Sequence, residues 1–313
     1  MAGLRGHGRV LVAVPLEPWN APGHNAPSDE QGKPDKMTQS VSDPPQGADH
    51  DHVLRTDHGA VAHLTLARPA SRNALSLAMM GALADHLSAI SRDPAVLCVV
   101  LSGEGPAFCA GHDLREITKA RAAPDEGRAL FEETMGRCSS LMQQIAALPQ
   151  PVIAAVEGVA TAAGCQLVAT CDLAVASAAA HFCTPGVDIG LFCSTPGVAL
   201  GRAVAPKHAM EMLLTGDMIG AEEAHRFGLV NRIVPQGRAL EAALAWAGQI
   251  ATKSPQALRM GKATFRRQMA CPLPEAYDLA SRAMVENLLK PDASEGVGAF
   301  LDKRAPTWHE VEP

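Results

Sequence analysis

Residues 151–172, PVIAAVEGVATAAGCQLVATCD, contain the pattern that decides the fold class. The run 152–156 is apolar and rich in β-branched residues, which is typical of a strand buried on both faces. Gly158 and the small residues 162–164 end this run, and the apolar positions within 167–171 then fit one face of a helix. The sequence therefore predicts a small-residue turn between a buried strand and a helix N-terminus.

Such a turn has two interpretations. Small side chains let a ligand approach the backbone, and the free N–H groups at a helix N-terminus favour a negatively charged oxygen. The turn is then an oxyanion site. Alternatively, its small residues only allow the strand and the helix to pack closely together.

The same order of elements occurs earlier in the chain. Residues 62–66 alternate like a strand, Ser76 is suited to cap a following helix, and 96–101 is another continuous apolar run. Strand, helix and buried strand make a βαβ unit, which recurs through 152–156 and 173–176. We therefore expect an α/β fold, with amphipathic helices near the C-terminus around 240–251 and 276–288.

A second small-residue turn follows the strand at 96–101. It reads GEGPAFCAGHDL at 103–114, in which Ala110-Gly111-His112 precede Asp113, a residue suited to cap a helix. Parallel strands in α/β folds place their ligands at their carboxyl ends. Two such turns can together supply two backbone donors to one oxygen.

Composition excludes several classes of protein. The chain has 313 residues, 47% of them hydrophobic, and a net charge of −6 with no dense run of Lys and Arg, which argues against nucleic-acid binding. No apolar run approaches the roughly 20 residues that span a membrane. Eight cysteines without a CxxC pair indicate free thiols in a reducing compartment. No metal site is predicted, because the cluster His50-Asp51-His52 lies in a polar tail.

The N-terminal residues 1–50 are rich in Pro, Gly, Asp, Gln and Ser, and we expect a disordered extension. A cytoplasmic location is the simplest expectation. Arg5 and Arg9, with no acidic residue before Glu17, also resemble a mitochondrial transit peptide, so the mitochondrial matrix is the alternative. Met37 is an alternative start.

Five segments together resemble the enoyl-CoA hydratase/isomerase (crotonase) superfamily. They are FCAGHDL at 108–114, AVEGVATAAGCQLVATCD at 155–172, RNALS at 72–76, MEMLLTGDMIGAEEAHRFGLVNRIV at 210–234 and AFLDKR at 299–304. The resemblance implies a crotonase-like spiral of βαβ units at 51–250. It also implies a helical C-terminal trimerisation region at 251–313, and hence a homotrimer or a dimer of trimers.

The resemblance also assigns roles to individual positions. It implies that the backbone N–H groups of His112 and Ala163 hold the thioester oxygen of an acyl-CoA. Positions near the coenzyme A moiety match Arg72, Ala74, Ala110 and Gly111, and positions that reach a neighbouring subunit's nucleotide match Phe300 and Lys303. Coenzyme A is then part of the substrate, and no separate cofactor is expected.

The two catalytic glutamates of the family's hydratases are absent. Their positions correspond to Gln166 and Gly186, neither of which can exchange a proton. Asp188 is a candidate replacement base if its apolar neighbours bury it and raise its pKa. Alternatively, it is an ordinary loop aspartate. Cys193 is a candidate nucleophile for thioester cleavage, or simply a buried thiol.

These features predict an enzyme, a lyase or isomerase that stabilises a thioester enolate in fatty-acid or related acyl-CoA metabolism. Two alternatives stay open. One is an acyl-CoA-binding or regulatory protein without hydratase chemistry, and the other is an acyl-CoA thioester hydrolase that uses Asp188 or Cys193.

Overall fold

A computed structural model describes residues 52–309 of the chain, so the predicted extension at 1–50 and most of the polar His50–His52 cluster lie outside the described residues. The fold is α/β, as predicted, and contains two sheets. The larger sheet has six strands in the order β1-β2-β3-β5-β7-β10, and only the β1–β2 pair is antiparallel. Its strands are β1 (Val53–His58), β2 (Val61–Leu66), β3 (Cys98–Gly103), β5 (Val152–Val156), β7 (Leu173–Ser177) and β10 (Arg232–Val234).

The continuous apolar runs of the sequence are the central strands of this sheet. In β3, Val99 and Leu101 belong to one apolar cluster, whereas Cys98 and Val100 belong to another on the opposite face. All five residues of β5 are buried, as the sequence predicts. A strand covered on both faces has no solvent-facing positions, which explains why these runs lack polar alternation.

A smaller sheet was not predicted from the sequence. It consists of β4 (Ala107–Cys109), β6 (Val159–Thr161), β8 (His181–Cys183) and β9 (Ile219–Gly220), in that order. Its strands have two or three residues each, too few for a hydrophobic period to be recognised. Because β4 and β6 are parallel neighbours, their carboxyl ends lie at the same edge.

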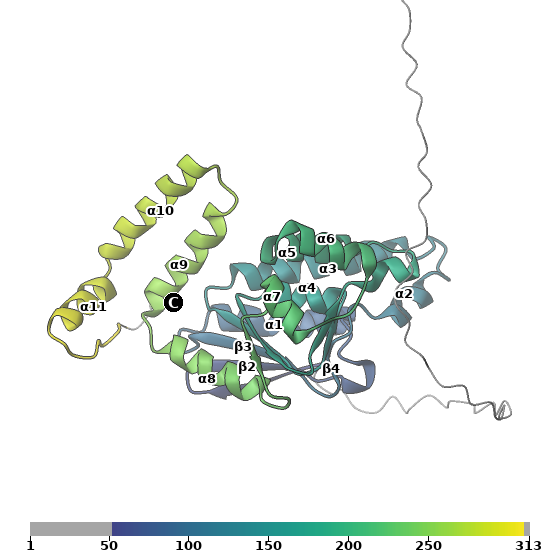
Figure 1. Ribbon diagram of the computed structural model, residues 1–313, viewed down its shortest axis with the longest axis horizontal. Helices are drawn as coiled ribbons and strands as arrows, with labels where there is room; N and C mark the ends of the chain where they lie inside the picture. The colour runs from purple at the N-terminus through teal and green to yellow at the C-terminus, as the bar shows by residue number, and fades with distance from the viewer. Residues whose placement is uncertain (1–51, 310–313) are drawn as a thin grey trace, which may run out of the picture. The chain divides into compact units, whose positions relative to one another are not determined.

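Helices cover both faces of the large sheet (Figure 1). They are α1 (Leu77–Ser91), α2 (Leu114–Ala120), α3 (Arg128–Ala147), α4 (Ala163–Thr170), α5 (Ser194–Ala203), α6 (Pro206–Thr215), α7 (Ala221–Phe227), α8 (Ala239–Ala251), α9 (Pro255–Gln268), α10 (Leu273–Leu288) and α11 (Pro291–Leu301). Short 3-10 helices run through Pro69–Ser71 and Pro185–Ile189.

Local capping signals in the sequence are confirmed. The Ser76 hydroxyl accepts a hydrogen bond from the Met79 N–H at 3.1 Å and so begins α1. The Asp113 carboxylate accepts from the Arg115 N–H at 2.8 Å and begins α2. The start of α8 is fixed differently, because the Glu157 carboxylate reaches from the β5–β6 turn to the N–H groups of Gly237 and Ala239.

The last three helices form a separate layer. Helices α9 and α10 pack side by side as an antiparallel pair, and α11 contacts both (Figure 1). Many large apolar side chains of this layer are exposed, namely Phe265, Met269, Leu273, Tyr277, Met284, Val285, Leu288, Leu289, Val297, Phe300 and Leu301. None of the helices that the structure describes has the length and hydrophobicity needed to cross a membrane.

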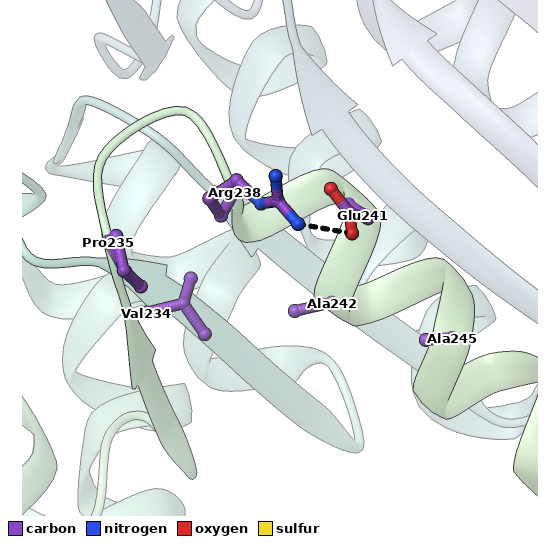
Figure 2. Close-up of a pocket in the computed structure, with 6 residues that line it drawn as sticks. All are labelled: Val234, Pro235, Arg238, Glu241, Ala242 and Ala245. Atoms are coloured by element: carbon purple, nitrogen blue, oxygen red, sulfur yellow. Dashed lines mark hydrogen bonds and ion pairs between the residues drawn. The ribbon is translucent and has the colours of Figure 1, made fainter.

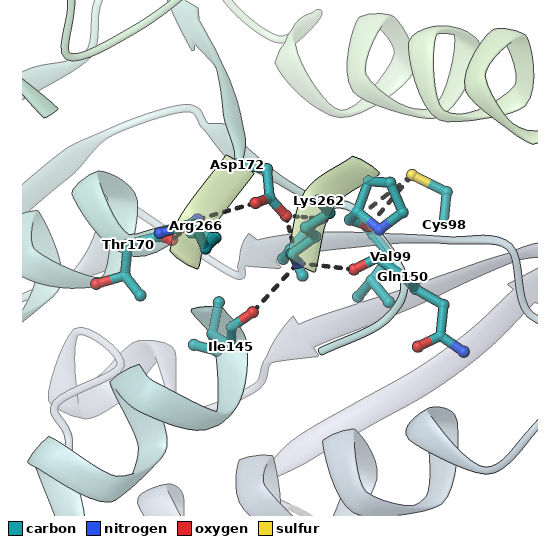
Figure 3. Close-up of polar contacts among 10 residues, drawn as sticks. Cys98, Val99, Ile145, Gln150, Thr170, Asp172, Lys262 and Arg266 are labelled. Atoms are coloured by element: carbon teal, nitrogen blue, oxygen red, sulfur yellow. Dashed lines mark hydrogen bonds and ion pairs between the residues drawn. The ribbon is translucent and has the colours of Figure 1, made fainter. Parts of the chain in front are cut away.

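An ion cluster fastens α9 to the core (Figure 3). Asp172 pairs with Lys262 Nζ at 2.6 Å and with Arg266 Nη2 at 2.9 Å. Lys262 also donates to the carbonyl oxygens of Ile145 and Gln150. Burial lowers the pKa of Lys262, and the Asp172 carboxylate opposes that shift. Arg266, although it lies on a surface helix, is therefore part of a structural ion cluster.

We expect Asp172→Ala to lower the free energy of unfolding by about 3–5 kcal/mol, because it leaves the Lys262 ammonium buried without its counter-ion. Lys262→Met is the matched control and should cost less, since Asp172 keeps Arg266 and the Val152 N–H as partners. Urea unfolding of the two variants measures the difference. An equal loss in both would contradict this account of the cluster.

Candidate functional site

The two small-residue turns of the sequence meet in space. They follow β4 and β6, the short parallel neighbours of the small sheet, and not the long strands at 96–101 and 152–156 that the sequence suggested. The Thr161 hydroxyl donates to the Ala110 carbonyl oxygen at 3.2 Å and ties the turns together. The sequence predicted the turns themselves, but only the unrecognised small sheet brings them side by side.

Close backbone contact explains the glycines of these turns. A Cβ on Gly164 would overlap the carbonyl oxygen of Cys109. Gly111 has a φ of +88°, and a Cβ there would lie 3.0 Å from the Ala162 Cβ and 3.4 Å from the Ala163 nitrogen. Gly111 therefore lies directly against Ala162 and the first residue of α4, Ala163.

Two backbone donors at this contact are unpaired. Within residues 52–309, the N–H groups of His112 and Ala163 donate to no protein acceptor. Their neighbours are paired: the Ala110 N–H donates to Arg72 at 3.0 Å, and the Ala162 N–H donates to Cys183 at 2.9 Å. Unpaired amides at a strand end and a helix N-terminus are the groups that hold a carbonyl oxygen as negative charge develops on it.

Ala162, the residue before α4, has a strained backbone. Its φ of +49° and ψ of −116° lie in a region that residues with a Cβ rarely adopt. Ala163 is not among the described residues with positive φ, so alanine at that position keeps an ordinary helical start. Alanine is thus accommodated at position 163, and the strain falls on the preceding residue.

The side chains near the position of the family's first glutamate are uncharged. Gln166 is buried in α4, and its Oε1 accepts a weak hydrogen bond from the Cys138 thiol at 3.8 Å. Burial raises the pKa of that thiol to about 11, so it remains protonated. The His112 side chain has a buried Nε2 without a partner among the described residues, and burial lowers the pKa of its imidazole.

The position of the second family glutamate has no room for a side chain. A Cβ on Gly186 would lie 2.8 Å from both the Cys193 Sγ and the Leu191 carbonyl oxygen. The loop after the 3-10 helix therefore folds onto Gly186 and fills the space. Burial raises the pKa of Cys193, and no described histidine is hydrogen-bonded to it, so nothing here activates that thiol as a nucleophile.

Asp188 lies in the 3-10 helix itself, at its exposed side. Its side chain is exposed, and its Oδ2 lies near Gly216 at the end of α6. The apolar neighbours Ile189 and Leu191 are also more than half exposed, at 59% and 53%. Asp188 was a candidate base only if its apolar neighbours buried it, and within this chain they do not. Asp188 as the proton carrier stays a prediction without that support.

The residues expected near coenzyme A fall into two groups. Arg72 and Ala74 flank Asn73 beside the first turn, where Ala110 and Gly111 also lie, and Arg72 is exposed. Phe300 and Lys303 lie instead at the end of α11, where Phe300 is 83% exposed and Lys303 has a φ of +53°. The structure thus brings the first group to the turns and leaves the second on the C-terminal layer.

Sequence reasoning missed Asn73 as a structural residue of the site. Its side chain is fully buried, donates to the carbonyl oxygens of Glu104 and Ala107, and accepts from the Arg68 N–H. These bonds fix the segment bearing Arg72 against the strand that leads into the first turn. The sequence feature that could have indicated this structural role is the position of Asn73 next to Arg72 in the segment RNALS.

A surface hollow of about 530 Å³ lies elsewhere, between β10 and α8. Figure 2 shows its lining, which includes the ion pair of Arg238 and Glu241. None of the predicted site residues lines it. We therefore place the candidate site at the paired turns and not at this hollow.

These features define an α/β protein of parallel strand and helix units in which two adjoining turns present free amides. The family model for enoyl-CoA hydratase/isomerase matches residues 56–311, and the chain belongs to that family. The fold is shared with solved crotonase-type structures, which confirms the resemblance inferred from the motifs.

Individual relatives are similar over most of the chain. The rat protein named "Enoyl-CoA hydratase domain-containing protein 3, mitochondrial" is 48% identical over 79% of this chain and 81% of its own length. The crystal structure of its human counterpart is 44% identical, with a TM-score of 0.78 and coverage of 82% and 100% of the two chains. An enoyl-CoA hydratase structure from Mycobacterium smegmatis has 48% identity, a TM-score of 0.79 and coverage of 83% and 100%. The segment TPGVDIGLFCSTPGVAL at 184–200 resembles the same domain-containing protein 3 subgroup, and the identity over most of the chain confirms that resemblance.

We expect Ala162→Gly to raise the free energy of unfolding by about 1 kcal/mol, because glycine removes the cost of a positive φ. Ala163→Gly is the control one residue later. It should lower stability by up to about 1 kcal/mol, since glycine weakens the start of a helix without relieving strain. Thermal unfolding measures both, and a loss of stability in both variants would contradict the proposed strain.

Proposed function

We propose that the chain binds an acyl-CoA thioester and stabilises its enolate between the N–H groups of His112 and Ala163. The observation that supports this proposal is the contact between the two turns, in which the N–H groups of His112 and Ala163 have no partner among the described residues. Membership of the enoyl-CoA hydratase/isomerase family supports a lyase or isomerase acting in fatty-acid or related acyl-CoA metabolism. Coenzyme A enters as part of the substrate, with Arg72, Ala74, Ala110 and Gly111 beside it.

The chemistry assigned to the site uses charge stabilisation more than proton transfer. An enolate forms when negative charge moves onto the thioester oxygen, and two fixed N–H donors lower the energy of that state. Neither the Gln166 amide nor Gly186, which has no side chain, can add or remove a proton. Activity as a conventional hydratase is therefore expected to be weak, while thioester binding is retained.

A substitution in the first turn tests the site. Gly111→Ala should weaken binding of a butyryl-CoA analogue, in which a methylene replaces the sulfur, by about tenfold or more. Its Cβ would press on Ala162 and displace the His112 amide. Gly59→Ala is the control, because Gly59 also has a positive φ but nothing lies within 4 Å of its Cβ position. Titration calorimetry gives the affinities, and equal affinities in both variants would refute the assignment.

Hydration of crotonyl-CoA should be slower than in a relative with both glutamates, by about 10²–10⁴-fold. Gln166→Glu should recover part of this rate, because it restores one carboxylate in the buried position. Gly186→Glu should recover nothing, because the Cys193 thiol and the Leu191 carbonyl fill its space. If the parent hydrates at ordinary rates and Asp188→Asn abolishes this, Asp188 is the base and the proposed weakness is wrong.

We also propose a homotrimer or a dimer of trimers. Exposed apolar side chains on α10 and α11, including Phe300, support burial against other copies of the chain. In such an assembly Phe300 and Lys303 would reach the nucleotide of a neighbouring subunit.

Truncation before Ala299 should weaken coenzyme A binding while leaving the α/β core folded, because Phe300 and Lys303 are removed and the core elements are not. Light scattering and calorimetry test assembly and binding together. A monomer that binds coenzyme A at full strength would refute the assembly proposal.

For location we propose a compartment that keeps thiols reduced, either the cytoplasm or the mitochondrial matrix. Seven of the eight free cysteines are buried, which suits such a compartment. The word mitochondrial in the name of the rat relative, together with Arg5 and Arg9, supports the matrix.

A further inference from the structure

The chain turns back on itself at the end of α11. Lys303 has a φ of +53°, in the left-handed region that residues with a side chain rarely adopt. Its N–H donates to the Phe300 carbonyl oxygen at 3.3 Å, and the Arg304 N–H donates to that of Ala299 at 3.0 Å. Such a conformation persists where other contacts hold it in place, and it often marks a functional position. Here those contacts come from the residues that follow, 304–309, which we call the C-terminal strap.

The first half of the strap is bonded to α11. Arg304 donates through Nη1 and Nη2 to the two carboxylate oxygens of Glu295, at 2.7 and 2.8 Å. The Thr307 N–H donates to the same carboxylate at 2.7 Å. These hydrogen bonds, that of Arg304 foremost, lower the pKa of Glu295 to about 2, so the carboxylate stays ionised at neutral pH. The strap therefore runs back along α11 toward the start of that helix.

The second half of the strap reaches the junction of α8 and α9 (Figure 1). The Trp308 indole N–H donates to the Thr252 carbonyl oxygen at 2.8 Å, at the end of α8. The His309 N–H donates to Asp292 Oδ1 at 2.9 Å. The other oxygen of Asp292 accepts from the hydroxyl of Ser254, the residue that caps α9. Because the Asp292 side chain is only 2% exposed, this end of the strap is anchored to a buried group.

Lys303 is the cation that this arrangement leaves available. Its side chain is exposed, and no carboxylate within residues 52–309 forms an ion pair with it. Arg304, the next residue, is already engaged by Glu295 and Asp302. A lysine ammonium binds phosphate as a point charge, and it binds more tightly when its backbone is already held in the binding position.

We propose that Trp308 is a positioning residue, which closes the strap so that Lys303 is held ready for a phosphate of the coenzyme A nucleotide. The inference rests on the proposed function, which places Lys303 at the nucleotide of a neighbouring subunit. The Trp308 ring lies against Gly296 of α11, where an added Cβ would be 3.3 Å from it, while its N–H is bonded to the end of α8. Trp308 thus joins the two elements that fix the turn, and it acts through Lys303 and not on the ligand itself.

Calorimetry with two analogues of a butyryl thioester, each with a methylene in place of the sulfur, tests the inference in the full chain. One analogue carries complete coenzyme A, and the other ends at pantetheine and lacks the nucleotide. Trp308→Ala should weaken binding of the coenzyme A analogue by about tenfold and change pantetheine affinity by less than about twofold, because only the cost of ordering Lys303 rises. Trp246→Ala is the matched control, because the Trp246 ring packs on Arg232 of β10, and it should change neither affinity.

A double-mutant cycle shows whether Trp308 acts through Lys303. Lys303→Met should weaken binding of the coenzyme A analogue, and adding Trp308→Ala to it should weaken binding no further. Equal losses for both analogues, no loss in either single variant, additive losses in the double variant, or a smaller particle mass of Trp308→Ala in light scattering would overturn the inference. The proposed function would stand in each of these cases as long as the parent binds the analogues. Failure of the parent to bind either analogue would overturn both.

Discussion

The candidate site depends on one close contact, in which the backbone at Cys109 and Gly111 presses against residues 162–164. A side chain on Gly164 would overlap the Cys109 carbonyl oxygen, and one on Gly111 would press on Ala162. Because both turns leave parallel strands of one small sheet, they lie at the same edge of that sheet. Any shift of either turn would separate the donors, so the small residues are a requirement of geometry and not of local chain flexibility alone.

Features set by near neighbours in the chain could be predicted from the sequence. The buried strand Val152–Val156 and the caps at Ser76 and Asp113 follow from patterns within a few residues, and the structure confirms them. The small sheet could not be predicted, since its strands are too short to show a period. The pairing of Lys262 with Asp172 joins positions 90 residues apart, and no local pattern encodes it.

The same limit applies to the site. Motifs placed His112 and Ala163 in small-residue turns, and the packing of the turns then explains why their amides are free. The motifs did not reveal that the Leu191 carbonyl and the Cys193 thiol close over Gly186, because that contact depends on the path of a loop. Nor did they reveal that Asp188 is exposed, since exposure depends on what packs over the loop.

Departures from a relaxed, fully paired interior gather at the start of α4. Ala162 has a strained backbone, the Ala163 amide is unpaired, and in the adjoining turn the buried His112 Nε2 finds no partner among residues 52–309. A stable core normally avoids each of these features, and their combined cost is offset elsewhere, in the apolar clusters and the Asp172 ion cluster. Because these costs fall in two adjoining turns, a ligand that pairs with both free amides is a simpler explanation than independent packing defects.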